Sequence, residues 1–182
     1  MLEIGFSGPY ALLPNVDETP LLLANNEAWY AGICLWTFLH RQAHRVNFVG
    51  VCTHSLAERH NEHLMDFLAG RRTFYESADL AEGTLTPAYR PEEGNARFVA
   101  KFPALMNELA QLRIFFAPFR GPEPVLERIG AGIAAHLHQI GPAAQWLDNG
   151  PTDYSASVYD EALTVRIRCP EVIADLPEEM HL

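Results

Sequence analysis

The sequence predicts an α+β fold in which a small central three-stranded antiparallel sheet is flanked by helices. Short segments rich in aromatic and β-branched residues indicate strands, and longer segments with apolar residues at helical spacing indicate helices. These segments follow one another in the order strand, strand, helix, helix, strand, helix. With 182 residues and 48% hydrophobic residues, the chain has the size and apolar content of one domain, which we expect to span residues 1–182.

The first two strands are expected at residues 29–38 and 46–52, where they would form an antiparallel hairpin. A helix then begins at Ser55, because Ser55 followed three residues later by Glu58 fits a capping box. Apolar residues continue at helical spacing up to Gly70, where the helix ends. This helix is the element that the sequence defines most sharply.

Residues 71–97 contain prolines and glycines with little periodicity, which predicts a long irregular loop. Three aromatic residues of this loop, with two arginines nearby, could clamp a nucleic acid, but we expect at least two of the three to fill the loop's own small core. The residues concerned are Phe74, Tyr75, Tyr89, Arg71 and Arg72.

The rest of the core is expected to hold a second helix, a third strand and a last helix. The last helix opens at the sequence GPEP and contains Gly130, whose cost inside a helix indicates close packing against the sheet. Outside the core we expect an N-terminal extension with one strand and an apolar run, and an acidic C-terminal extension with one strand and a loose end. The expected ranges are helix 98–111, strand 112–119, the last helix to about 139, strand 10–13, apolar run 21–24 and strand 162–168.

The formal net charge of −10 argues against a protein that grips nucleic acid by bulk electrostatics, because Lys and Arg dominate phosphate binding. The excess acid lies at the two ends, in residues 1–30 and 148–182, whereas residues 31–147 are balanced and use arginine almost exclusively. No stretch has the apolar length of a membrane span, and the start of the chain lacks the pattern of a signal peptide. We therefore expect a soluble, cytoplasmic protein without a membrane partner, and the sequence leaves its oligomeric state open.

Two short motifs lie on the predicted hairpin, and further residues that could carry chemistry follow on the predicted helices and after the last of them. Gly32, Ile33 and Cys34 form the first tripeptide, and Phe48, Val49 and Gly50 form the second. On the next helix come Leu56, Arg59 and His63, followed by Glu127 on the last helix and Asn149 after it. In order and in kind, these residues across residues 29–150 resemble the GIY-YIG nuclease family, whose core we therefore place at 29–150, between extensions at 1–28 and 151–182.

The resemblance implies an endonuclease-like hydrolysis of DNA phosphodiester bonds. Arg59 would stabilise the phosphate, with His63 four residues along the same helix as a helper. Glu127 would hold one divalent ion, Mg²⁺ or Mn²⁺, through hard oxygen ligation, and Asn149 would complete the set. The alternative is a GIY-YIG-like domain that has lost catalysis and binds a nucleic acid, a nucleotide or a protein partner.

This chain departs from the family at both motif tyrosines, which are replaced by Cys34 and Phe48. Phenylalanine cannot help to deprotonate a water molecule, so the general base is open between the Cys34 thiol and one of the nearby imidazoles. These are His40, His44, His54 and His60. A third hypothesis, ranked lower, is a zinc site formed by Cys52, His54, His60 and His63.

Overall fold

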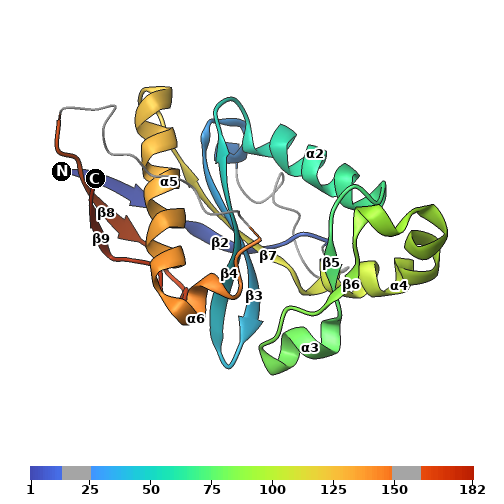
Figure 1. Cartoon of the computed structure of the whole chain (residues 1–182). Helices are drawn as coiled ribbons and strands as arrows, with labels where there is room; N and C mark the ends of the chain where they lie inside the picture. The colour runs from blue at the N-terminus through green and yellow to red at the C-terminus, as the bar shows by residue number, and fades with distance from the viewer. Residues whose placement is uncertain (14–25, 149–160) are drawn as a thin grey trace.

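The computed structural model describes residues 1–13, 26–148 and 161–182, which form a mixed α and β fold (Figure 1). The central sheet has the strand order β2 (Ser7–Ala11), β7 (Arg113–Pro118), β3 (Gly32–His40), β4 (Ala43–Cys52), and all neighbouring pairs are antiparallel. The prediction of an α+β fold is confirmed, but the prediction of three strands is wrong. β2 adds a fourth strand, because the N-terminal segment pairs with β7 through contacts distant in sequence that local patterning does not reveal.

The predicted hairpin is present as β3 and β4, joined by a tight turn at Arg41 and Gln42, both of which have positive φ. β3 begins three residues later than predicted, because Asn26–Trp29 forms a short 3₁₀ helix, η1. At Gly32 a side chain would collide with the carbonyl oxygen of Ala117 on β7. The strand therefore needs glycine where it enters the sheet.

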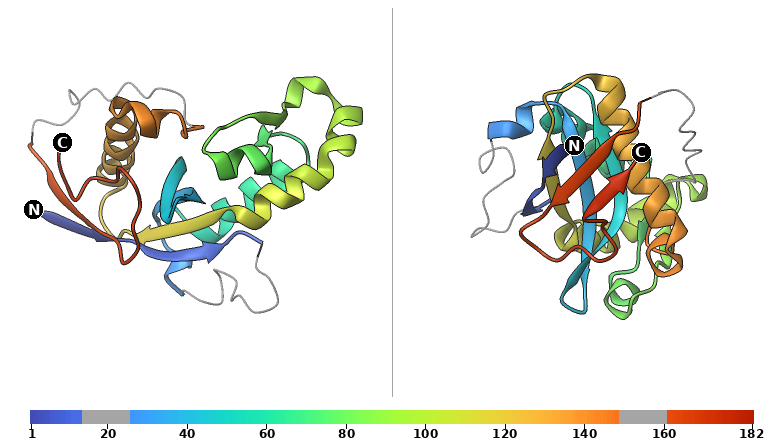
Figure 2. Two further views of the ribbon diagram at one scale, coloured as in Figure 1. Left: turned by 90° about the horizontal axis from the view of Figure 1, so that it is seen from below. Right: turned by 90° about the vertical axis from the view of Figure 1, so that its left-hand side faces the viewer.

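Helices cover one face of the central sheet, and a helix together with a second sheet covers the other (Figures 1 and 2). α2 and α4 lie on the first face, and α5, α6 and the three-stranded sheet β1-β8-β9 lie on the second. Their bounds are α2 Leu56–Leu68, α4 Asn95–Gln111, α5 Glu123–Gln139, α6 Gly141–Ala144, β1 Leu2–Gly5, β8 Thr164–Arg168 and β9 Glu179–His181.

Side chains of β3 alternate between two hydrophobic clusters, as the period of a strand requires. Cys34, Trp36 and Phe38 pack toward α2 and α4, whereas Ile33 and Leu35 pack toward α5. All five are at most 2% exposed. The central sheet is thus buried on both faces, which explains why its strand segments read as nearly continuous apolar runs.

Two predicted helices begin and pack as the sequence indicates. The Ser55 side chain accepts a hydrogen bond from the Glu58 backbone N–H at 3.3 Å and caps α2. On α5, a side chain at Gly130 would collide with Val51 of β4, so the glycine lets the helix approach the sheet closely. Both local predictions are confirmed.

The predicted irregular loop at 71–97 is instead largely ordered structure, and that prediction is wrong. It contains β5, α3, β6 and a 3₁₀ helix η2, held together by an aromatic core. Phe74 stacks on Tyr89 with ring centroids 5.2 Å apart, and Tyr75 is also buried. The expectation that these aromatics fill the segment's own core is confirmed. The bounds are β5 Phe74–Tyr75, α3 Ser77–Glu82, β6 Pro87–Tyr89 and η2 Pro91–Glu93.

The strand expected at 162–168 is present as β8, but the C-terminal end is not loose. β9 pairs with β8 on one side, and β1 pairs with β8 in parallel on the other. The N-terminal strand expected at 10–13 lies at Ser7–Ala11, and the apolar run 21–24 lies outside the described residues. In the described part of the chain, no helix has the length and apolar character needed to span a bilayer.

Backbone hydrogen bonds cover the outer edge of β4. The Asp148 N–H donates to the Asn47 carbonyl at 2.7 Å, and the Ala174 N–H donates to the His44 carbonyl at 2.8 Å. The His44 N–H in turn donates to the carbonyl of Val172 at 3.0 Å. Segments before and after the undescribed residues 149–160 therefore meet the same strand.

Candidate functional site

Arg59 lies in the first half of α2, the helix that leaves the sheet directly after β4. Its guanidinium donates to Glu62 at 3.0 Å, and its side chain remains half exposed. An exposed ion pair of this kind contributes little to stability, so its rearrangement around a ligand costs little. Arg59 can therefore exchange its contact with Glu62 for a contact with an anion at little cost in free energy.

A pocket of about 290 Å³ lies beside Arg59. Its walls come from the end of β4, the short connection that follows, and the first two turns of α2. It combines a guanidinium, an imidazole, two hydroxyls, two carboxylates and a thiol. The lining residues are Val51, Cys52, Thr53, His54, Ser55, Glu58, Arg59 and Glu62.

The imidazole of this pocket belongs to His54, one of the four histidines considered as the general base. Its Nδ1 lies 3.0 Å from the Thr53 hydroxyl. This contact engages Nδ1 and fixes the ring, so chemistry at His54 would go through Nε2. Sequence reasoning named His54 only as one imidazole among several, because the pocket that selects it depends on where β4 ends.

His63 is buried on α2 and is not part of the pocket wall. Its ring packs edge-on against Trp36 at 5.1 Å and Phe48 at 5.2 Å between centroids. Burial, together with the positive charges of Arg72 and Arg59, lowers the pKa of His63 to about 4. His63 is therefore neutral at pH 7, and a role as catalytic helper stays a prediction that this environment does not favour.

Glu127 lies on α5, exposed to solvent, in the layer on the opposite face of the sheet from α2. It does not line the pocket beside Arg59. The structure thus brings Arg59 and His63 onto one helix and sets Glu127 on another layer. Asn149, the last residue of the predicted set, lies outside the described residues.

The four motif positions on the hairpin lie side by side. Cys34 is opposite Gly50, and Gly32 is opposite Cys52. Cys34 is 1% exposed, and Phe48 contacts the rings of Trp36 and His63. The positions that carry tyrosines in the family are thus packing positions in this chain.

A partly buried polar network lies beside His63, and the sequence pattern does not predict it. Arg72 contacts His63 Nδ1 and lies 3.4 Å from a carboxylate oxygen of Asp148, while the Tyr75 hydroxyl donates to the other oxygen at 3.1 Å. The backbone N–H of Tyr75 donates to Glu108 on α4. This network ties α2, β5, α4 and the segment after α6 together.

Glu108 is the residue of this network that the sequence could have revealed. It is 1% exposed, and it falls among Leu105, Leu109 and Leu112, which have the spacing of a buried helix face. Burial raises the pKa of Glu108 to about 8, against the opposing hydrogen bond from Tyr75. Burial and the nearby Asp148 raise the pKa of the Tyr75 phenol as well.

The residues of the zinc hypothesis do not gather in one place. Cys52 and His54 line the pocket, but His60 and His63 do not. Within residues 1–13, 26–148 and 161–182, no group of three or more His, Cys, Asp or Glu side chains is placed to hold a metal ion. The geometry therefore gives the zinc site no support.

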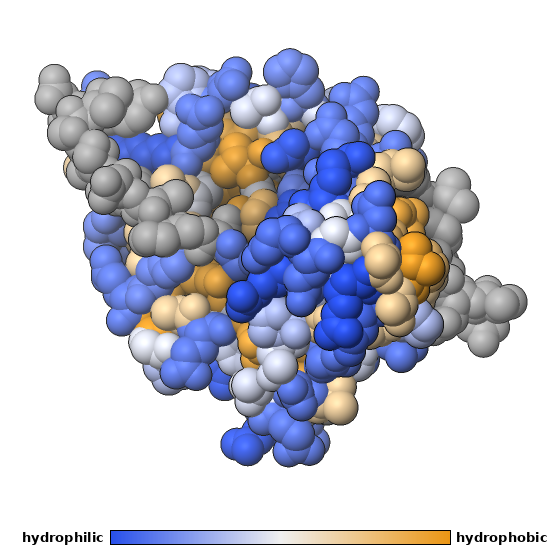
Figure 3. Space-filling model, turned by 45° about the vertical axis from the view of Figure 1, so that its right-hand side comes forward, coloured by the Kyte–Doolittle hydropathy of each residue, from blue (hydrophilic) through white to orange (hydrophobic). Residues whose placement is uncertain are grey.

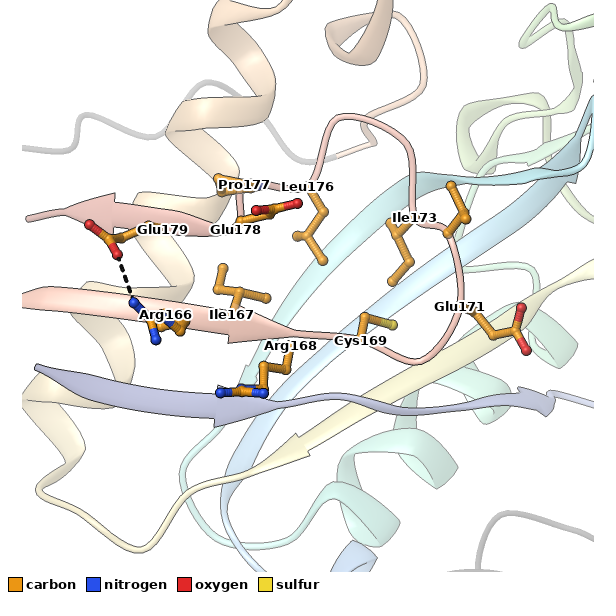
Figure 4. Close-up of a pocket in the computed structure, with 11 residues that line it drawn as sticks. Arg166, Ile167, Arg168, Cys169, Glu171, Ile173, Leu176, Pro177, Glu178 and Glu179 are labelled. Carbon is orange, nitrogen blue, oxygen red and sulfur yellow. Dashed lines mark ion pairs between the residues drawn. The ribbon is translucent and has the colours of Figure 1, made fainter.

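A larger cavity of about 700 Å³ lies on the second sheet, between β8 and the segment that leads to β9 (Figure 4). Its two arginines already have carboxylate partners. Arg166 faces Glu179 across the two strands at 3.7 Å, and Arg168 pairs with Glu3 at 3.0 Å. Arg59 is paired in the same way with Glu62, so the two cavities differ not in charge compensation but in the imidazole of His54, which only the pocket beside Arg59 has among its lining residues.

Hydrophilic side chains cover most of the face drawn in Figure 3, with hydrophobic ones visible between them. Comparisons of the chain with protein-family models, with curated proteins and with solved structures found no match.

Proposed function

We propose that this chain is a GIY-YIG-like nuclease domain that hydrolyses phosphodiester bonds in the pocket beside Arg59. One observation carries the proposal: a single pocket combines Arg59, the imidazole of His54, and the carboxylates of Glu58 and Glu62. These are a cation for the phosphate, a base for the attacking water, and ligands for a divalent ion.

The order of elements also supports the proposal. The strands β4, β3 and β7 are adjacent and antiparallel, α2 follows β4, and α5 follows β7. This is the succession on which the resemblance to the GIY-YIG family rests. β2 and the second sheet would then be additions to the family core.

Arg59 and His54 have separate tasks in this proposal. Arg59 would bind the phosphoryl oxygens and offset the negative charge that builds on them during hydrolysis. His54, held by Thr53 at Nδ1, would accept a proton from water at Nε2. An imidazole can accept a proton near neutral pH, and this would replace the part that a motif tyrosine takes in the family.

In this proposal the pocket would hold one Mg²⁺ or Mn²⁺ ion, with Glu62 released from its ion pair with Arg59. Mg²⁺ is commonly held by one or two carboxylates, with water and substrate phosphate completing its shell. Glu58 and Glu62 can supply the carboxylates, and Glu127 remains the ligand that the resemblance implies. When bound, the ion supplies further positive charge for the leaving oxygen.

A second function, binding without catalysis, is favoured by the packing of Cys34 and Phe48. Phe48 packs against Trp36, and neither Cys34 nor Phe48 lines the pocket. In that case Arg59 would bind the phosphate of a nucleic acid or nucleotide, and no bond would break. Cleavage assays separate the two functions.

The test is incubation of plasmid and branched DNA with the protein and Mg²⁺ or Mn²⁺. We compare the wild type with Arg59→Ala, His54→Ala, Glu58→Gln and Glu127→Ala. Removing Arg59 should reduce cleavage about 100-fold, as losing one transition-state donor commonly does. The matched control is Arg71→Ala, which removes an exposed arginine paired with Asp66 near the other end of α2.

Cleavage that is lost in the Arg59 variant but retained in the Arg71 variant supports the nuclease proposal. A loss in the Glu58 variant and not in the Glu127 variant places the ion in the pocket, and the reverse assigns it to Glu127. If no protein cleaves but the wild type binds a labelled oligonucleotide and the Arg59 variant does not, the binding function holds instead. Equal cleavage by all variants contradicts both.

A further inference from the structure

Two cysteines and two glycines form a square on the hairpin β3–β4. Cys34 faces Gly50, and Cys52 faces Gly32, so the cysteines lie on one diagonal and the glycines on the other. A side chain at Gly50 would place its Cβ 2.5 Å from the sulfur of Cys34. The absence of side chains at the glycine corners leaves the space between the strands to the two sulfur atoms.

The two thiols lie diagonally across the hairpin on the face that packs toward α2, and their interaction shifts their pKa values in opposite directions. The interaction with Cys34 lowers the pKa of Cys52, with help from the positive charge of Arg59 and against the effect of burial. The same interaction and burial hold the pKa of Cys34 well above its usual range. Cys52 is therefore the sulfur that more readily becomes a thiolate, and Cys34 is the one that keeps its proton.

The two sulfurs also differ in access. Cys52 is 3% exposed and forms part of the wall of the pocket beside Arg59, whereas Cys34 is 1% exposed and does not line the pocket. A small neutral oxidant that enters the pocket thus meets Cys52 first. A thiolate is the nucleophilic form of cysteine, so Cys52, which borders the pocket and has Cys34 as a neighbouring thiol, is the sulfur placed for oxidation.

We propose that the pair Cys52 and Cys34 is a reversible oxidation site for small hydroperoxides. The Cys52 thiolate attacks the terminal peroxide oxygen, the O–O bond breaks, and the hydroxide or alkoxide that is released takes a proton from solvent and departs as water or an alcohol. Cys52 is now a sulfenic acid. The Cys34 thiol attacks the oxidised sulfur, a disulfide forms, and water leaves with the Cys34 proton.

Forming this bond would change the shape of the pocket. A disulfide holds its two Cβ atoms about 3.5–4.5 Å apart, closer than diagonal neighbours in a sheet commonly lie. The end of β4 would therefore move toward β3. Because α2 follows β4 directly, the positions of His54 and Arg59 would shift as well.

The experiment treats the reduced full-length protein with a small excess of hydrogen peroxide at pH 7.5. Remaining thiols are then alkylated, and the protein is digested and analysed by mass spectrometry. We expect two of the three thiols to be lost, one peptide pair joined through Cys34 and Cys52, and a free Cys169. Dithiothreitol should restore all three thiols.

Two variants test the order of events. In Cys34→Ser, Cys52 should accumulate as a sulfenic acid that a dimedone-type reagent traps. In the matched control Cys169→Ser, the disulfide should form as in the wild type. Circular dichroism before oxidation verifies that each variant is folded.

Other results would overturn the proposal. These are oxidation of Cys169 before Cys52, modification of Cys52 only after unfolding in guanidinium, or conversion of Cys52 to a sulfinic acid with Cys34 still free. The measurement uses no nucleic acid, so its outcome is independent of the cleavage assays.

Discussion

Replacing Glu108 by glutamine should flatten the dependence of stability on pH. Glu108 is 1% exposed, and burial raises its pKa from 4.5 to about 8. Between these values the unfolded chain releases the proton while the folded chain keeps it. Stability therefore falls as pH rises through this window and levels off above about pH 8.

The magnitude follows from the size of the shift. A change from 4.5 to about 8 corresponds to about 5 kcal/mol at 1.36 kcal/mol for each pKa unit, an upper figure for one buried group. Glutamine has nearly the same volume and keeps an oxygen that can accept the Tyr75 N–H. Glu108→Gln should thus match the wild type near pH 5 and exceed its stability by several kcal/mol at pH 9.

The assay is urea unfolding of both proteins at intervals from pH 5 to pH 9, followed by circular dichroism. Equal slopes of stability against pH in the two proteins would show that Glu108 does not titrate as described. A variant less stable than the wild type at pH 9 would refute the reasoning outright, because it would mean that the charged carboxylate stabilises the fold.

Two further predictions concern other contacts of the core. Arg72→Met keeps apolar packing on the Phe48 ring but removes a positive charge beside His63. The pKa of His63 should therefore rise from about 4, and NMR titration of the imidazole would measure this rise. An unchanged pKa would contradict the assignment of Arg72 as a cause of the shift. Because the pKa of His63 is lowered in the folded protein, stability is lost as pH falls from about 6.5 to 4. In Arg72→Met the folded pKa lies closer to 6.5, so the pH range over which stability is lost becomes narrower and the loss becomes smaller. Gly130→Ala should lower the free energy of unfolding by about 1–3 kcal/mol, because the new methyl group overpacks against Val51 despite alanine's better helix propensity. Urea unfolding at pH 7 measures this change. A stabilised variant would show that α5 can move away from β4.

The sequence predicted those parts of the fold that local signals specify. Ser55 caps α2 because a hydroxyl beside free backbone N–H groups is a local device, and Gly130 marks close packing because glycine inside a helix needs a reason. Pairing between distant segments has no such signal. β1 and β9 join β8, and β2 joins β7, through contacts across more than one hundred residues or through short strands with little pattern.

The candidate site was predictable to a similar degree. Arg59 could be named, but its pocket depends on the end of β4 and on the first turns of α2 together. The spacing of Arg59 and His63 puts them near each other on the helix without saying that His63 faces the core. His63 is also more deeply buried than His60, the other histidine of this helix.

The covered edge of β4 has a consequence for behaviour in solution. An edge strand with unpaired backbone groups is a template on which another chain can add a strand and begin to aggregate. Here Asp148, Val172 and Ala174 already occupy backbone groups of Asn47 and His44. The segments before and after residues 149–160 thus block intermolecular strand pairing at this edge. Shortening either segment should make the protein prone to self-association without disturbing the core first.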